Sequence, residues 1–76
     1  MKIQERFGIT IRSLRKIKQV SQECLAYETG IDRTYISDIE NGTRKISIEI
    51  IERLANYFEM PISELFRKVE EYGNFE

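Results

Sequence analysis

The chain has 76 residues, of which 41% are apolar and 33% are charged, and its net charge is -1. This length and composition indicate one small globular domain over residues 1–76 and exclude a disordered or collagen-like chain. The absence of histidine excludes Ser-His and Cys-His catalytic pairs, and the single cysteine excludes the usual thiolate zinc clusters. We therefore expect neither an enzyme nor a metal site.

The first predicted element is an amphipathic helix that ends near Gln19. Its apolar residues recur at intervals of three and four, as one face of a helix requires. They are Ile3, Phe7, Ile11, Leu14 and Ile17. Its basic residues are expected on the exposed side.

Two short helices follow. Ser21 offers an N-cap oxygen to the second helix, and Gly30 ends that helix where a left-handed cap is favoured. Asp32 is the N-cap expected for the third helix, which the pair Asn41-Gly42 ends. Residues 43–46 are predicted to form a loop.

A fourth and a fifth helix complete the chain. Ser47 caps the fourth, which has one apolar face made of Ile48, Ile51, Ala55 and Phe58. The fifth begins at Pro61 and carries Ile62, Leu65, Phe66 and Val69 at helical spacing. No segment alternates as a strand would, so the predicted fold is an all-α bundle of five helices. Residues 73–76 are expected to form a frayed tail.

Residues 22–41 have the spacing of a helix-turn-helix. Two short helices that cross at a tight turn need a small residue where they meet, which is Ala26, and a residue that tolerates a left-handed backbone, which is Gly30. Apolar residues must fill the wedge between the two helices, and these are Leu25, Ile31, Ile36 and Ile39.

These segments resemble the Cro and phage-repressor-like (XRE-type) helix-turn-helix family. The matching segments are FGITIRSLR, SQECLA, GI, YISDIENG and ISELF, from about Phe7 to Phe66. The run DRTYISDIENG is most similar to the controller proteins of restriction-modification systems. The chain departs from the family at Ile46, where a proline is common, and at Cys24, which replaces the acid of a capping box.

The resemblance implies DNA recognition by the third helix. On a helical wheel Arg33, Thr34, Ser37 and Asn41 share one side, opposite Ile36, Ile39 and Glu40. We predict base reading by Arg33, through a bidentate contact to guanine, with Thr34, Ser37 and Tyr35 nearby. The alternative for Arg33 is a solvated surface side chain, and for Tyr35 a packing role.

Phosphate contacts are predicted on either side of this helix. The residues are Gln22, Asn41, Thr43, Arg44 and Lys45, and the Gln22 role follows from the family. The alternative for Arg44 and Lys45 is a merely soluble loop. Asp32 is expected to act as a cap and Asp38 to reduce non-specific binding. The family also implies a buried ion pair between Arg15 and Glu40, whose alternative is a surface glutamate.

Charge is divided unevenly along the chain. Residues 1–45 carry nine basic and six acidic side chains, whereas residues 46–76 carry three basic and seven acidic ones. The first part could therefore face phosphate while the second faces away, although an ordinary mixed surface is an equal alternative.

Surplus apolar residues suggest a second subunit. Ile50, Leu54 and Tyr57 form a second stripe on the fourth helix, and with Phe66 and Val69 they are the predicted homodimer interface. The alternative is that the fifth helix covers this stripe within one subunit. Two-fold symmetry would separate the recognition helices by roughly 34 Å and require a pseudo-palindromic operator.

The predicted function is that of a homodimeric, sequence-specific regulator of transcription bound to double-stranded DNA, with no cofactor, small-molecule ligand or membrane partner. The lone cysteine and the lack of a signal sequence suggest the cytoplasm. The alternative is an antitoxin-like module that kept the fold and mainly binds a partner protein.

Overall fold

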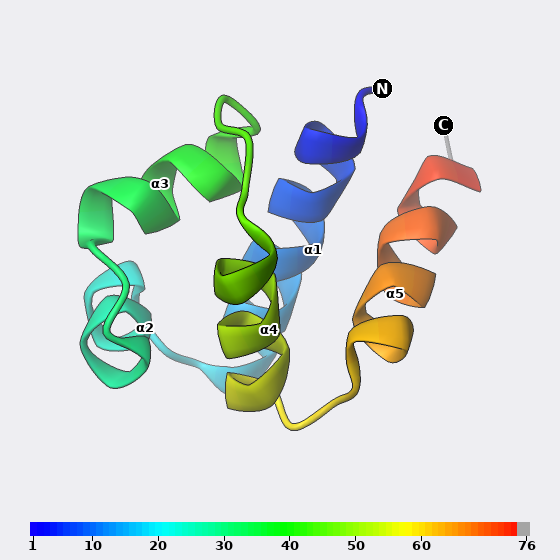
Figure 1. The fold of residues 1–76 in the computed structure, drawn as a ribbon. Helices are drawn as coiled ribbons and strands as arrows, with labels where there is room; N and C mark the ends of the chain where they lie inside the picture. The colour runs from blue at the N-terminus through cyan, green and yellow to red at the C-terminus, as the bar shows by residue number, and fades with distance from the viewer. Residues whose placement is uncertain (75–76) are drawn as a thin grey trace.

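The computed structural model describes residues 1–74, which form five helices (Figure 1). They are α1 (Ile3–Lys18), α2 (Gln22–Thr29), α3 (Arg33–Asn41), α4 (Ile48–Tyr57) and α5 (Ile62–Asn74). α1 packs against α3 on one side and against α5 on the other, and α2 packs against both α3 and α4 (Figure 1). The predicted all-α fold of five helices is confirmed. None of the helices within residues 1–74 combines the length and apolar character needed to cross a membrane.

The helix ends lie where the sequence predicts them. The Ser21 hydroxyl accepts a hydrogen bond from the Cys24 amide at 3.0 Å, although Cys24 supplies no capping-box acid. The Asp32 carboxylate accepts from the Thr34 amide at 2.9 Å, and the Ser47 hydroxyl from the Ile50 amide at 3.3 Å. Gly30 and Gly42 end α2 and α3 with φ angles of 73° and 72°, in the left-handed region where other residues are strained.

α5 extends to Asn74 and therefore includes residues 73–74 of the predicted tail. Residues 75–76 lie outside the described part of the chain.

One hydrophobic core joins all five helices. Its members are Phe7, Ile11, Leu25, Ala26, Ile31, Ile36, Ile39, Leu54, Ala55, Leu65 and Val69. The four wedge residues predicted between α2 and α3 are all buried, and Ala26 is 9% exposed, so the two helices cross as the spacing of the motif indicates.

Four residues of the predicted apolar faces lie on the surface instead. The exposed fractions are 51% for Ile3, 78% for Ile17, 77% for Ile48 and 37% for Ile62. Each side chain lies in the first or last turn of its helix, where the neighbouring helices do not cover it.

Two residues of the predicted subunit interface belong to the core. Leu54 and Val69 are both 0% exposed within one subunit, where both belong to the hydrophobic core and α4 packs against α5. Ile50, Tyr57 and Phe66 are only partly buried, and the Phe66 ring lies 5.8 Å from that of Phe7 between centroids. The interface prediction is therefore wrong for Leu54 and Val69, for which the alternative of burial inside the subunit holds.

α1 and α3 approach each other at a glycine. A Cβ atom on Gly8 would collide with the carbonyl oxygen of Ile39 and lie 2.8 Å from that of Glu40. Because both neighbours are backbone atoms, only a shift of one whole helix could relieve the contact. Gly8 therefore sets the distance between α1 and α3.

We predict that Gly8→Ala lowers the free energy of unfolding by about 2 kcal/mol or more, because α1 and α3 must separate. Urea unfolding measures this change, with Lys16→Ala on the exposed side of α1 as the control. A gain of about 1 kcal/mol, which the better helix propensity of alanine would give alone, would contradict the close approach.

Candidate nucleic-acid interface

The turn between α2 and α3 presents the start of α3 to solvent. Thr29 stabilises the turn, since its hydroxyl donates to the Leu25 carbonyl at 2.6 Å and accepts from the Ile31 amide at 3.3 Å. Arg33 and Thr34 in the first turn of α3 are exposed, and Ser37 on the same side is half-buried. Arg33 forms no ion pair among residues 1–74, so its guanidinium is available to a ligand.

Tyr35, Asp38 and Arg44 form a second group of side chains in contact next to the exposed start of α3. The Arg44 guanidinium carbon lies 4.3 Å from the centroid of the Tyr35 ring. Its Nη2 and Nε atoms donate to Asp38 Oδ2 at 3.0 and 3.3 Å. Tyr35 therefore packs against Arg44, and the Asp38 carboxylate already balances part of the Arg44 charge.

The loop after α3 is tied to the end of that helix. The Thr43 amide and hydroxyl both donate to the Asp38 carbonyl, at 3.1 and 3.3 Å. Thr43, Arg44 and Lys45 are all exposed. Thr43 and Arg44, two of the predicted phosphate residues, are therefore held against Asp38 of α3, and Lys45 follows them in the loop.

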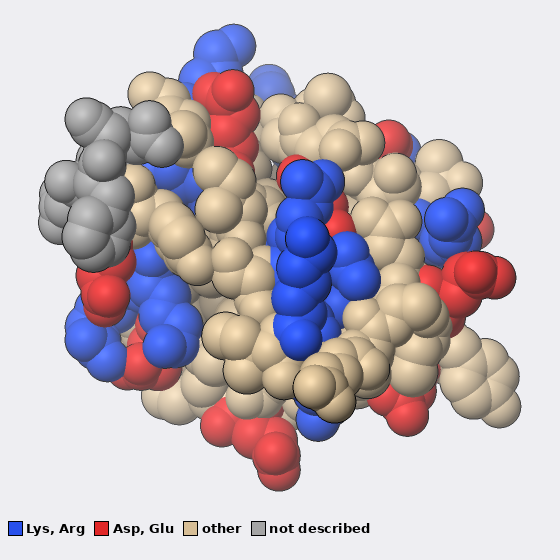
Figure 2. Space-filling model, turned by 180° about the vertical axis from the view of Figure 1, so that it is seen from behind, with Lys and Arg blue, Asp and Glu red and all other residues tan. Residues whose placement is uncertain are grey.

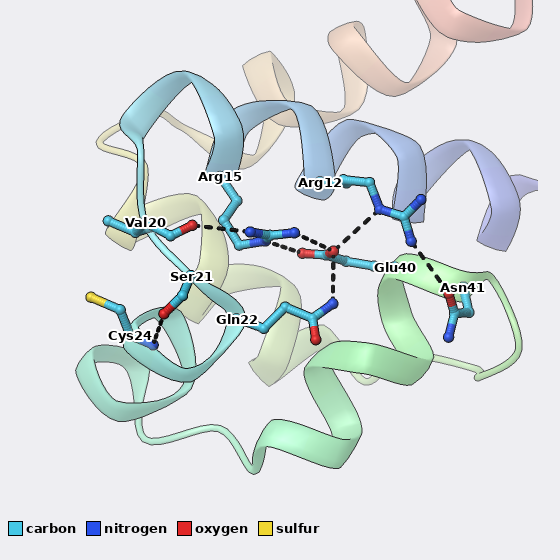
Figure 3. A network of polar contacts seen from close by, with 8 residues as sticks. All are labelled: Arg12, Arg15, Val20, Ser21, Gln22, Cys24, Glu40 and Asn41. Atoms are coloured by element: carbon cyan, nitrogen blue, oxygen red, sulfur yellow. Dashed lines mark hydrogen bonds and ion pairs between the residues drawn. The ribbon is translucent and has the colours of Figure 1, made fainter.

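A buried carboxylate connects three helices behind this face (Figure 3). The Glu40 side chain is 0% exposed and accepts from Arg15 Nε at 2.7 Å and Nη2 at 3.0 Å. Gln22 Nε2 donates to Glu40 Oε1 at 3.0 Å, and Arg12 Nε donates to the same oxygen at 3.4 Å. The ion pair that the resemblance implies between Arg15 and Glu40 is present, and α2 joins it through Gln22.

Glu40 is ionised at neutral pH. Burial alone would raise the pKa of Glu40, but hydrogen bonds from Arg15, Gln22 and Arg12 and the charge of Arg15 outweigh burial. The pKa of Glu40 therefore lies below its ordinary value of 4.5. The hydrogen bond to Glu40 likewise raises the pKa of Arg15.

The ionised network fixes the orientation of the side-chain amides of Gln22 and Asn41, which are both predicted to contact DNA. Because a carboxylate only accepts, Gln22 must turn its NH₂ group toward Glu40, which leaves one N–H and the carbonyl oxygen for a ligand. Asn41 Oδ1 accepts from Arg12 Nη2 at 3.3 Å, so the Asn41 NH₂ group faces away from Arg12. Gln22 thus keeps a single amide donor for a ligand.

Arg12 is a residue of this site that the sequence did not predict. Its position three residues before Arg15 places both on one face of α1, which is the only sequence signal for its role. Seen from behind, the molecule carries a strip of basic side chains near the middle of the view, and basic and acidic side chains lie side by side toward its edges (Figure 2). A group of basic side chains is therefore present on the surface despite the net charge of -1.

We predict that Glu40→Gln lowers the free energy of unfolding at pH 7 by about 3–5 kcal/mol, because it leaves the Arg15 guanidinium without its counter-charge. Since the folded-state pKa of Glu40 is lowered, its contribution is complete above pH 4.5 and disappears as the pH falls through the folded-state pKa. The difference between variant and wild type should therefore shrink below pH 4.5.

Urea unfolding at a series of pH values measures this difference, with the exposed Glu70→Gln on α5 as the control. A difference for Glu40→Gln that stays constant between pH 7 and pH 3 would contradict the ionised pair.

Comparison with known proteins agrees with this geometry. The family model described as a helix-turn-helix domain matches residues 8–71. The control protein C.MunI from a Mycoplasma species is 42% identical over 69 residues, which cover 90% of this chain and 93% of that protein.

Two solved structures are similar over most of their length. The restriction-modification controller protein C.AhdI from Aeromonas hydrophila has a TM-score of 0.77 at 39% identity, over 82% of this chain and 94% of that one. C.Esp1396I, crystallised as a tetramer in complex with its natural 35 base-pair operator, has a TM-score of 0.83 at 30% identity, over 93% of both chains. The chain therefore belongs to the helix-turn-helix domain family and is similar, over nearly its whole length, to the restriction-modification controller proteins.

Proposed function

We propose that the protein is a sequence-specific, DNA-binding regulator of transcription that acts as a homodimer on a pseudo-palindromic operator, in the manner of a restriction-modification controller. The observation that carries this proposal is the exposed first turn of α3, where Arg33 is free of ion pairs among the described residues. The operator complex of C.Esp1396I supports it. We further propose that the protein works in the cytoplasm, where the bacteria that carry its relatives hold their DNA.

Each side chain has a separate role in the proposed complex. Arg33 donates to a guanine edge in the major groove, with Thr34 and Ser37 beside it, because the first turns of a recognition helix reach the bases. Tyr35 positions Arg44 by stacking. Thr43, Arg44, Lys45, Asn41 and the remaining Gln22 donor bind phosphates, which adds affinity without sequence preference.

The proposed subunit contact lies around the start of α4. Ile48 is 77% exposed there. Ile46, two residues before it, and Ile51, three residues after it, line a hollow of about 170 Å³ together with Ile3, Gln4, Phe7 and Phe66. A second copy that inserts Ile48 near this hollow would bury apolar surface in both subunits, as a two-fold contact requires. In the proposed interface, this surface takes the place that the sequence analysis gave to Leu54 and Val69.

We predict that Arg33→Ala weakens binding to the operator by about 1–3 kcal/mol and relaxes the preference at one base position, while binding to random DNA changes little. Arg44→Ala should weaken binding to both DNAs similarly. Selection of bound fragments from random DNA gives the operator, and fluorescence anisotropy gives the affinities.

Equal losses for Arg33→Ala on operator and random DNA would contradict its role in base reading. A protein that binds no selected DNA, and binds a protein partner with little dependence on salt, would instead favour the antitoxin-like alternative.

We also predict that Ile48→Glu shifts the protein toward monomers and weakens binding to the full operator more than to a half-site, because a charge would be buried at the contact. Ile17→Glu is the matched control, since Ile17 is equally exposed at 78% but lies at the end of α1. Sedimentation equilibrium measures the subunit number. Monomers formed equally by both variants, or by neither, would contradict this interface.

A further inference from the structure

We infer that Arg12 is a phosphate-binding residue of the DNA interface and that it turns the Asn41 amide so that its donors face the DNA backbone. The inference rests on the proposed function and extends it to a residue of α1. It is based on charge balance, unused hydrogen-bond donors and exposure in the network of Figure 3.

The Glu40 charge is already balanced by Arg15. Arg15 contacts both carboxylate oxygens, at 2.7 and 3.0 Å, and its Nη1 atom donates to the Val20 carbonyl at 3.0 Å. Its side chain is only 14% exposed. Arg12 adds a single long contact of 3.4 Å to the same carboxylate, and its side chain is 43% exposed. The network therefore holds two guanidinium groups and one carboxylate, and the surplus positive charge lies on the more exposed Arg12.

Most Arg12 donors remain available. An arginine has five N–H donors. In residues 1–74, Arg12 uses one from Nε toward Glu40 and one from Nη2 toward Asn41. The remaining donors lie on the two terminal nitrogens of a planar group, which is the arrangement that binds phosphate oxygens in a bidentate manner.

Asn41 is turned by the same contact. Since a guanidinium group only donates, Asn41 presents its carbonyl oxygen to Arg12 and its NH₂ group to the opposite side, and phosphate oxygens accept only from such donors. In Figure 3, Arg12 and Asn41 lie together on one side of Glu40, while Arg15 and Gln22 lie on the other. The hydrogen-bond donors of Arg12 on α1 and of Asn41 at the end of α3 are thus next to each other.

If Arg12 had a purely structural role, the expected effect of removing it would be different. If Arg12 only helped to hold Glu40, its loss would lower stability and leave the number of ions released on DNA binding unchanged. A phosphate contact contributes about 0.9 to the slope of log affinity against log salt, so a dimer loses about 1.8 when both copies are removed.

The experiment measures anisotropy titrations of wild type, Arg12→Gln and Arg12→Lys with the selected operator and with random duplex DNA at several salt concentrations. Arg67→Gln is the charge-matched control, because Arg67 is 64% exposed on α5 and pairs with Glu64. Thermal unfolding of each variant is measured in parallel. Arg12→Gln should weaken both DNAs by the same factor, and a fourfold rise in salt should weaken wild type about tenfold more than this variant. Arg12→Lys and Arg67→Gln should keep the wild-type slope.

A wild-type slope for Arg12→Gln would overturn the inference while leaving the proposed function intact. The inference also fails if Arg12→Lys shows both a lower unfolding temperature and a smaller slope of log affinity against log salt than wild type, because the change in slope would then accompany a loss of stability. A folded wild-type protein that binds neither DNA would overturn the proposed function as well.

Asn41→Asp separates binding from stability at the second residue. The new carboxylate would still accept from Arg12, so the unfolding temperature should not fall, but it would present an acceptor to the phosphate. Binding to both DNAs should weaken accordingly. Wild-type affinity for Asn41→Asp would overturn the orientation assigned to the amide.

Discussion

The buried carboxylate of Glu40 is the contact on which the geometry of the interface depends. It lies on α3, has no exposed side-chain surface, and accepts hydrogen bonds from two arginines of α1 and a glutamine of α2. A buried charge without such donors costs several kcal/mol, so any movement of α3 away from α1 or α2 leaves the charge uncompensated. The network therefore fixes the position of α3 relative to α1 and α2.

Close backbone contact between α1 and α3 occurs at the same point as the polar network, next to Glu40. Gly8 approaches the carbonyl oxygens of Ile39 and Glu40, and Glu40 is also the centre of the polar network. A Cβ on Gly42 would lie 2.9 Å from the Glu5 Cα, so the end of α3 also contacts the start of α1 closely. Backbone contact and hydrogen bonding thus hold α3 against one rigid support, and its opposite side stays exposed.

The sequence predicts the features that depend on neighbouring residues. The N-caps at Ser21, Asp32 and Ser47 and the left-handed Gly30 and Gly42 follow from local chemistry, and all were predicted. The Arg15–Glu40 pair was predicted only through the family resemblance. Features that depend on distant residues could not be predicted in this way. Arg12 meets Glu40 across 28 positions, and no local pattern indicates that pairing. Leu54 and Val69 show the same limit, because a helical wheel identifies an apolar stripe but not whether a helix of the same chain or of a second copy covers it.

The acidic residues near the proposed DNA face explain how a chain with a net charge of -1 can present a basic surface. Asp32 caps α3, Glu40 is buried against Arg15, and Asp38 pairs with Arg44. The Asp38–Arg44 pair is partly exposed on both sides, at 35% and 42%, and pairs of this kind contribute only about 0–1 kcal/mol. In the proposed DNA complex, Arg44 would exchange Asp38 for a phosphate at little cost, and Asp38 would repel DNA that the rest of the surface does not fit. This arrangement would keep non-specific affinity low and leave the choice of sequence to Arg33, which has no ion-pair partner among residues 1–74.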